Sequence, residues 1–217
     1  MVPLKIDFVS DISCPWCAIG LAALDRALAN LADEVSATVH TQPFELNPQM
    51  EPEGEDITEH LSRKYGSTPQ EQAQIRERIR QRGVEVGFEF NPDGRGRIYN
   101  TFNAHRLLHW ASETAPSHQM ALKRAMLVAC HRDRADMSST EVLLNVAAQA
   151  GLDTEKARQV LGSDAFAKQV REQEAYYASH GIRSVPAVII NDRHLISGGQ
   201  PVEVFEQALR QIASGQA

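Results

Sequence analysis

The sequence predicts an α/β fold interrupted by a large inserted all-α domain, on three observations. Residues 1–52 show a β-α-β pattern, residues 163–217 show an α-β-β-α pattern, and residues 53–162 are mainly helical. Strands that alternate with helices in this way are typical of a sheet with helices packed on its faces. We therefore expect one domain built from residues 1–52 and 163–217, with residues 53–162 as an inserted helical domain.

The first segment contains two strand patterns and one helix pattern. Apolar residues alternate with polar ones over residues 4–8 and again over residues 35–39, which is the period of a strand with one buried face. Between these strands the leucines recur at spacings of three and four, which places them on one helix face. They are Leu21, Leu24, Leu28 and Leu31.

The last segment predicts a helix over residues 164–179 and an extended connection over residues 181–186, because a residue that precedes proline disfavours the α region. The apolar run 187–190 predicts a strand. Asn191 and Asp192 are turn residues, and residues 194–197 complete a hairpin. A helix that begins at Pro201 ends the chain.

The inserted segment contains a capping box, Thr68 to Glu71, with proline at the first helical position. It predicts a charged helix to about Gln81. Further helices are expected over residues 99–111, 120–129 and 142–150, and a loop is expected over residues 91–97.

Composition and charge exclude several classes of protein. The chain has 217 residues, 42% of them hydrophobic, and a net charge of −6. This composition excludes wholesale disorder, and the acidic balance argues against a nucleic-acid partner. No apolar stretch approaches the ~20 residues of a membrane-spanning helix, so no membrane partner is expected. Three cysteines do not make a disulfide scaffold, and the first residues lack a signal-peptide pattern. We expect a cytoplasmic protein with reduced thiols.

Cys14 and Cys17 are three residues apart, where the first predicted strand meets a helix. Free N–H groups and the helix dipole at a helix N-terminus favour a thiolate. Pro15 fits an early helical position, and Cys17, one turn later, can close a disulfide with Cys14. Cys14 is the candidate attacking thiolate and Cys17 the candidate resolving thiol, with Trp16 as part of an apolar docking surface.

Taken alone, this pair has three other interpretations: buried structural thiols, half of a zinc site, or a chance Cys-x-x-Cys. Zinc needs four ligands, and the third cysteine, Cys130, lies beside His131 in an apolar helix. Nothing else repeats the Cys-x-x-Cys spacing, so we expect no metal site.

The Val185–Pro186 bond stands directly before the apolar strand 187–190. A cis proline here would leave the Val185 backbone free to pair with an extended substrate, which makes both residues candidates for substrate binding. The alternative is an ordinary trans proline that opens an edge strand.

These residues together resemble the thioredoxin fold, in particular the DsbA-like branch with a helical insertion and its FrnE-type dithiol-disulfide isomerases. The FrnE-type pattern Asp-x-x-Cys-Pro-Trp-Cys is matched by residues 11–17 and is followed by Ile19-Gly20. An Asn-x-x-x-Ala-His-Arg pattern is matched by residues 100–106, and Ile-Ser-Gly-Gly-Gln by residues 196–200. The resemblance covers nearly the whole chain.

The resemblance implies a thiol-disulfide oxidoreductase with no resident cofactor. Its expected substrate is a disulfide-containing protein or a low-molecular-weight thiol. The residues expected to bind this substrate are Pro15, Trp16, Val185 and Pro186. Glutathione as co-substrate and a homodimer are further expectations. The inserted domain would cover the cysteines and shape access.

Two other functions stay open. The first is a glutathione-dependent isomerase or transferase. Isomerases related to 2-hydroxychromene-2-carboxylate isomerase, and kappa-class glutathione transferases, resemble this architecture but commonly have serine at the position of Cys14. The second is a redox-regulated module that binds unfolded chains.

Three further residues each have two interpretations. His105 either faces the active site as a substrate contact or is a core histidine bonded within the helices. Asp11 either tunes Cys14 or caps its turn. Cys130 is either a small buried hydrophobe or a regulatory or crosslinking thiol.

Overall fold

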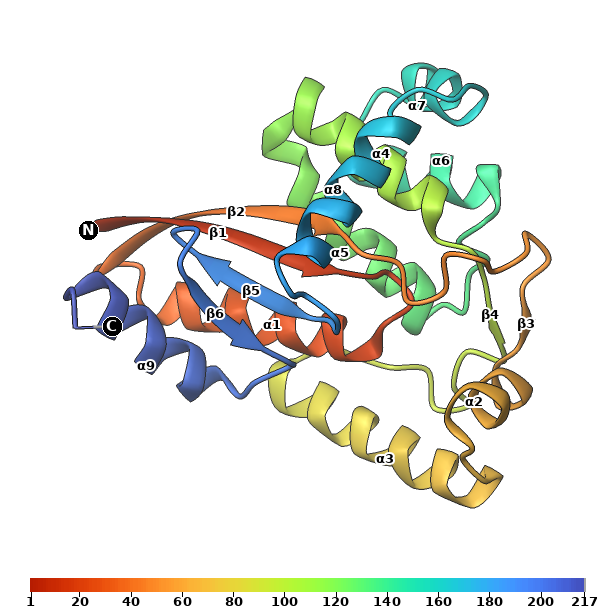
Figure 1. Ribbon diagram of the computed structural model, residues 1–217, viewed down its shortest axis with the longest axis horizontal. Coiled ribbons are helices and arrows are strands. Elements are labelled where there is room, and N and C mark those ends of the chain that lie inside the picture. Colours follow the sequence, from red (N-terminus) through yellow and green to blue (C-terminus); the bar gives the residue numbers. More distant parts are fainter. Residues whose placement is uncertain (217) are drawn as a thin grey trace.

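The computed structural model describes residues 1–216. A four-stranded sheet forms its centre, and helices surround the sheet (Figure 1). The strands are β1 (Val2–Ser10), β2 (Val35–Pro43), β3 (Glu55–Asp56), β4 (Arg97–Ile98), β5 (Ala187–Ile190) and β6 (His194–Ser197). The helices are α1 (Pro15–Asn30), α2 (Ile57–Tyr65), α3 (Pro69–Val86), α4 (Phe102–Thr114), α5 (Pro116–His131), α6 (Thr140–Gln149), α7 (Thr154–Leu161), α8 (Ala167–Ser179) and α9 (Val202–Ala213).

The central sheet has the strand order β2-β1-β5-β6. β1 and β2 are parallel and are joined through α1, whereas β5 is antiparallel to both β1 and β6. The N-terminal and C-terminal segments of the chain therefore meet where β1 pairs with β5. β3 and β4 form a separate two-stranded ladder.

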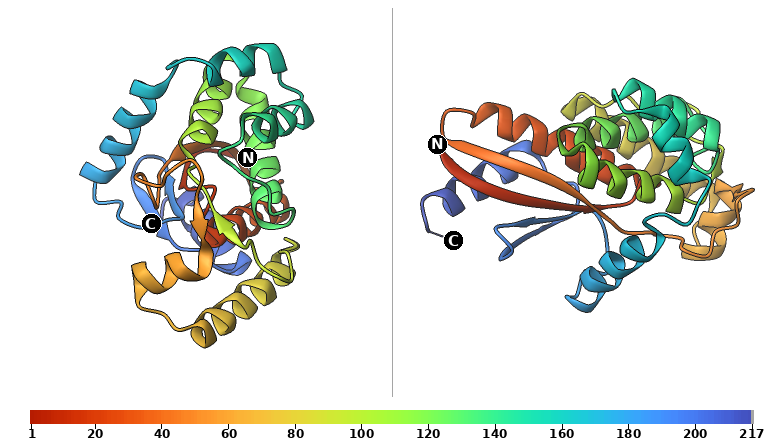
Figure 2. Two further views of the ribbon diagram at one scale, coloured as in Figure 1. Left: turned by 90° about the vertical axis from the view of Figure 1, so that its right-hand side faces the viewer. Right: turned by 90° about the horizontal axis from the view of Figure 1, so that it is seen from above.

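The alternation along β1 divides its side chains between the two faces of the sheet. Leu4, Ile6 and Phe8 enter the main core with α1 and α9. Val9 faces the other way and packs with Tyr177 of α8. α1 and α9 thus cover one face while α8 lies on the opposite side (Figure 2, right).

The helices of the inserted segment gather at one end of the sheet, beyond the carboxyl ends of β1 and β2 (Figure 2). They have a core of their own from α4 to α7, which also takes in Ile12 from the loop after β1. In return, Val86 and Leu127 of the inserted segment pack in the sheet core. Each segment defined by the expected boundaries at residues 52 and 163 therefore contributes side chains to the core of the other.

The predicted strands and hairpin are confirmed: the loop between β5 and β6 has Asn191 and Asp192 with φ of 53° and 58°. The capping box at Thr68 is also present.

Several helix boundaries differ from the prediction, among them the start of α5, which begins at Pro116 rather than at residue 120. α3 runs on to Val86, because only Gly87, with φ of 78°, provides the left-handed cap that ends it. The helix expected from residue 164 begins at Ala167, since Phe166 is left-handed with φ of 62°. The helix expected from residue 99 begins at Phe102.

α2 and α7 were not predicted individually. Each is short and begins at an aspartate that caps its first turn, Asp56 for α2 and Asp153 for α7. Both are polar and shorter than the other helices, so each offers few apolar positions from which to recognise a helix in the sequence. Within residues 1–216, no helix has the length and apolar character needed to cross a membrane.

Candidate active site

Cys14 occupies the N-cap position of α1, with Pro15 in the first turn as predicted. Its carbonyl accepts the Cys17 N–H at 3.0 Å, which begins the helix. Cys14 is 4% exposed and Cys17 is 0% exposed. Both are free thiols. The strand-to-helix turn thus holds one thiol near the surface and the other directly behind it.

The Val185–Pro186 peptide bond is cis, and this part of the second segment lies against Cys14. The Cys14 thiol donates to the Val185 carbonyl at 3.6 Å. Pro186 is buried against Gly20 of α1, where an added Cβ would lie 3.0 Å from Pro186 Cγ. Gly20 therefore permits the close approach of the proline loop to the helix that carries the cysteines.

The two thiols differ in acidity. The Cys17 thiol, followed by the backbone N–H groups of Cys17 and Trp16, stabilises a Cys14 thiolate and holds the pKa of Cys14 below its ordinary value, against burial and the charge of Asp11. Burial, then the interaction with Cys14, raises the pKa of Cys17 well above its ordinary value. This difference in pKa between the two thiols is the one required of an attacking thiolate and a resolving thiol.

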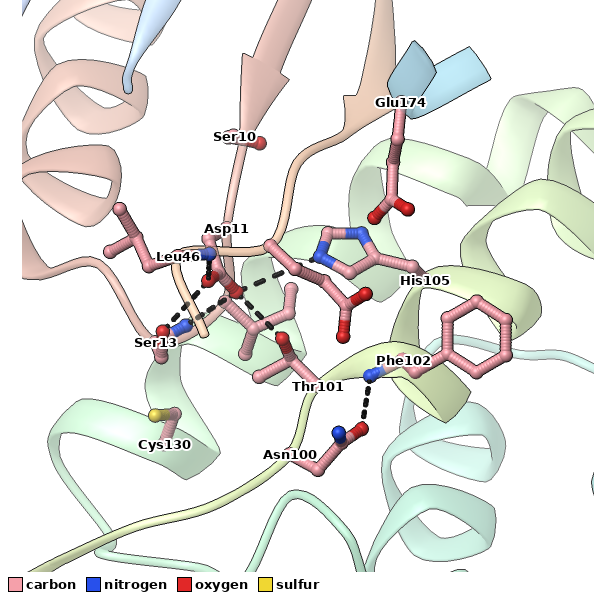
Figure 3. Close-up of polar contacts among 12 residues, drawn as sticks. Ser10, Asp11, Ser13, Leu46, Asn100, Thr101, Phe102, His105, Cys130 and Glu174 are labelled. Atoms are coloured by element: carbon pink, nitrogen blue, oxygen red, sulfur yellow. Dashed lines mark hydrogen bonds and ion pairs between the residues drawn. The ribbon is translucent and has the colours of Figure 1, made fainter. Parts of the chain in front are cut away.

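Asp11 lies at the centre of the contacts that hold the loop before Cys14 (Figure 3). Its carboxylate accepts from the Ser13 N–H at 3.1 Å and the Ser13 hydroxyl at 2.9 Å. It also accepts from the Leu46 N–H at 2.7 Å and the Thr101 hydroxyl at 2.8 Å. Asp11 is therefore a cap for the turn, and it ties that turn to the segment after β2 and to the start of α4.

His105 is 2% exposed, with Nε2 at 3.6 Å from Asp11 Oδ1. Burial by itself raises the pKa of Asp11, but His105 and the N–H donors of Leu46 and Ser13 outweigh it and hold that pKa well below its usual range. The His105 ring also lines a cavity of 250 Å³ whose lining does not include either active-site cysteine. His105 thus reaches the cysteines through Asp11.

Cys130 is 6% exposed at the end of α5, behind the same loop. Arg95 connects the two, since it donates to the Ser13 carbonyl at 2.7 Å and lies 3.7 Å from the Cys130 sulfur. Burial raises the pKa of the Cys130 thiol, although Arg95 opposes this. These surroundings fit the interpretation as a small buried residue better than that as a reactive thiol.

The residues that border the two cysteines on the outside are half-buried. Pro15, Trp16 and Val185 are of this kind. Tyr65, at the end of α2, is near enough for the Cys14 charge to add to the effect of burial in raising the pKa of the Tyr65 hydroxyl. The end of α2 thus lies within electrostatic range of Cys14. Among residues 1–216, no group of three or more histidine, cysteine, aspartate or glutamate side chains is arranged to hold a metal ion.

Three polar residues at the site were missed in the sequence. Thr101 and Arg95 contact the loop before Cys14, and Lys123 of α5 is buried near both cysteines. For Lys123 the sequence contained one local sign, a lysine inside a helix that is predicted to be buried. The contacts of Thr101 and Arg95 depend on how the inserted segment folds back, and no local pattern encodes that.

Residues 5–210 match the family described as the DSBA-like thioredoxin domain. The chain belongs to this family. The match spans both segments of the sheet and the inserted helices, so the fold is a DsbA-like thioredoxin fold with its helical insertion.

Solved structures agree with this assignment. A probable DsbA oxidoreductase from Streptomyces coelicolor is 31% identical, with a TM-score of 0.87 over 99% of this chain and 91% of that one. The cytosolic disulfide reductase DsbM from Pseudomonas aeruginosa with GSH is 14% identical, with a TM-score of 0.65 over 97% and 99%. A 2-hydroxychromene-2-carboxylate isomerase is 15% identical, with a TM-score of 0.71 over 97% of both chains. The last two likenesses show the fold alone.

Proposed function

We propose that this DsbA-like protein is a dithiol-disulfide oxidoreductase whose redox centre is the Cys14–Cys17 pair. The observation that carries the proposal is the pairing of a Cys14 thiol of lowered pKa, at the N-terminus of α1, with a buried Cys17 thiol of raised pKa. A thiolate beside a second thiol one turn later is the arrangement that thiol-disulfide exchange requires.

The reaction begins when the Cys14 thiolate attacks one sulfur of a substrate disulfide. This forms a mixed disulfide with Cys14 and releases the other substrate sulfur as a thiolate. Cys17 then attacks the Cys14 sulfur, which closes the Cys14–Cys17 disulfide and releases the second substrate thiolate. Two electrons pass from the enzyme dithiol to the substrate, and the reverse sequence oxidises a substrate dithiol.

Substrate binding is assigned to the residues that border Cys14. Pro15 and Trp16 present half-buried apolar surface beside the sulfur. The Val185 backbone lies on its other side, next to Pro186 and within reach of the Cys14 thiol at 3.6 Å. An extended substrate chain that replaced this contact would pair with the Val185 backbone and bring its own disulfide to Cys14. His105, buried behind Asp11, would act on substrate only indirectly.

An equilibrium titration in graded glutathione buffers, read by thiol-trapping mass spectrometry, tests the proposal. We expect Cys14 and Cys17 to pass together between dithiol and disulfide in one two-electron transition. A midpoint near about −270 mV would indicate a reductant, and one near about −120 mV an oxidant. A pair that binds glutathione but never forms its own disulfide would instead favour the glutathione-dependent isomerase or transferase.

Alkylation by iodoacetamide tests the acidity of Cys14 separately. An ordinary cysteine thiol has a pKa of about 8.5. Because the pKa of Cys14 is lowered and that of Cys17 is raised, Cys14 is expected to react at a lower pH than an ordinary thiol does. Cys17 and Cys130 are expected to stay unmodified over the same range. Peptide mapping over a pH series measures all three rates, and equal rates for Cys14 and Cys17 would contradict the assignment of roles.

The remaining expectations belong to the same proposal. The substrate is a disulfide-containing protein or a small thiol, with glutathione as the alternative co-substrate and no resident cofactor. Residence in the cytoplasm and assembly into a homodimer stay predictions, and sedimentation of the purified chain tests the second. A chaperone-like binding module would show binding of unfolded chains that is independent of Cys14.

A further inference from the structure

Lys123 is buried in the middle of α5 without a partner for its charge. Its side chain is 0% exposed, and its Nζ has no hydrogen-bond partner within the part of the chain described, residues 1–216. The other four lysines of the chain are exposed. An unpaired ammonium inside a protein is strongly disfavoured, so a buried lysine without a carboxylate contact points to a role other than packing.

The packing of α5 directs Lys123 toward the cysteines. Met120 and Leu127, three residues before it and four after it, share its helix face, and both pack in the core that contains Cys14 and Cys17. Side chains on either side of Lys123 fix the rotation of the helix. Gln119 bonds with the backbone of Thr41 in β2, and Arg124 forms a 2.7 Å ion pair with Asp25 in α1.

The charged and titratable groups that act on Lys123 lie on α1, on the loop before α1 and on α5 itself. Burial lowers the pKa of Lys123 to about 8, and the charges of Cys17, Asp11, Cys14 and Cys130, in decreasing order, oppose that shift. Lys123 in turn lowers the pKa of Cys17, against the larger effects of burial and Cys14. Burial, then the charges of Arg95 and Lys123, lower the pKa of His131, which is also on α5.

Cys17 must lose a proton before it can attack the mixed disulfide, and at 0% exposure its thiol has no direct contact with bulk water. We propose that the Lys123 amine accepts the Cys17 thiol proton in this resolving step and returns it to Cys17 in the reverse reaction. The inference rests on the proposed exchange reaction, and it assigns the proton transfer that this reaction leaves open.

The step balances without a further reactant. The proton of the Cys17 thiol passes to neutral Lys123, which becomes an ammonium. The Cys17 thiolate attacks the Cys14 sulfur, the Cys14–Cys17 bond forms, and the bond from Cys14 to substrate sulfur breaks. The electron pair of that bond leaves on the substrate thiolate, which takes a proton from solvent.

The same arrangement sets the order of events. While Cys14 is a thiolate, its negative charge favours the ammonium form of Lys123. The mixed disulfide removes that charge, so that burial acts on the ammonium with less opposition and the equilibrium shifts towards the neutral amine. The base thus becomes available once Cys17 needs it.

A chromogenic nitrobenzoate disulfide separates the two chemical steps. Attack by Cys14 releases a first coloured thiolate, and attack by Cys17 releases a second. In Lys123→Met the second phase is expected to slow on the order of 100-fold at neutral pH, the usual contribution of a positioned base, while the first phase is retained. The exposed Lys156→Met variant is the matched control and should keep both phases.

The pH profile distinguishes proton transfer from a structural effect. In the wild type the second phase should level off at or below about pH 8, where Lys123 becomes neutral. In Lys123→Met it should keep rising with pH. An unchanged second phase with an unchanged profile overturns the role of Lys123 and leaves the oxidoreductase intact. A wild type with no second phase overturns the proposed function itself.

A measurement on the wild type covers the case in which Lys123→Met does not fold. With carbon-13 in the lysine side chains, one ε-methylene signal should titrate near pH 8 in the dithiol form, and lower after carbamidomethylation of Cys14. The signals of the four exposed lysines serve as the internal reference. If no signal titrates near pH 8 in the dithiol form, or if that signal does not move after carbamidomethylation of Cys14, the inference is overturned.

Discussion

Replacement of Cys14 by serine is expected to reduce disulfide exchange to the rate of the uncatalysed reaction. A serine hydroxyl at this position cannot form the mixed disulfide, and the buried Cys17 thiol has a pKa well above its ordinary value, so it does not replace Cys14 as nucleophile. Reduction of a protein disulfide and of glutathione disulfide, each followed by thiol release, measures the loss.

Cys130→Ala is the matched control for this experiment. Cys130 is buried behind the loop and its pKa is raised, so its removal should leave the exchange rate near that of the wild type. Exchange that survived in Cys14→Ser and disappeared in Cys130→Ala would place the redox centre elsewhere. Cys17→Ser, by contrast, should accumulate a stable mixed disulfide on Cys14, which intact-mass spectrometry detects as a substrate adduct.

Replacement of Asp11 by alanine is expected to lower the free energy of unfolding by about 3–5 kcal/mol, the range for removing one partner from a buried charged network. Asp11 is 1% exposed, so solvent screens its interactions little. The change leaves donors of Ser13, Leu46 and Thr101 without their acceptor. Urea unfolding measures the loss, and the exposed Asp33→Ala variant is the control with little expected change.

The pH dependence of this difference has a definite sign. Since the folded-state pKa of Asp11 is held well below its usual range, its contribution is fully present above the unfolded value of about 3.9. It is lost as the pH falls through the folded value. The difference between wild type and Asp11→Ala should therefore be constant near neutral pH and shrink in acid. A difference that grew in acid would contradict the assignment.

The same variant separates the two interpretations of Asp11. The carboxylate raises the pKa of Cys14 by its charge, although less than burial does. Asp11→Ala should therefore make Cys14 alkylation shift to lower pH even as the fold loses stability. Asp11 acts first as the cap of the loop, and its effect on Cys14 is to moderate the acidity of the thiol.

Local patterns in the sequence predicted the framework of this protein. The alternation in β1 and β2, the leucine spacing in α1 and the turn at Asn191–Asp192 depend on residues within one element, so they can be read without knowledge of the fold. The Cys14–Cys17 spacing belongs to the same class, because a helix N-terminus defines the environment of both thiols.

Only the tertiary structure decided which distant residues complete the site. Val185 lies beside Cys14, Thr101 bonds to Asp11, and Lys123 is buried near Cys17, although each pair is far apart along the chain. These neighbours are set by the pairing of β1 with β5 and by the way α4 and α5 pack against β2. Periodicity says which side of a helix is buried, and the packing of the whole chain determines what that side meets.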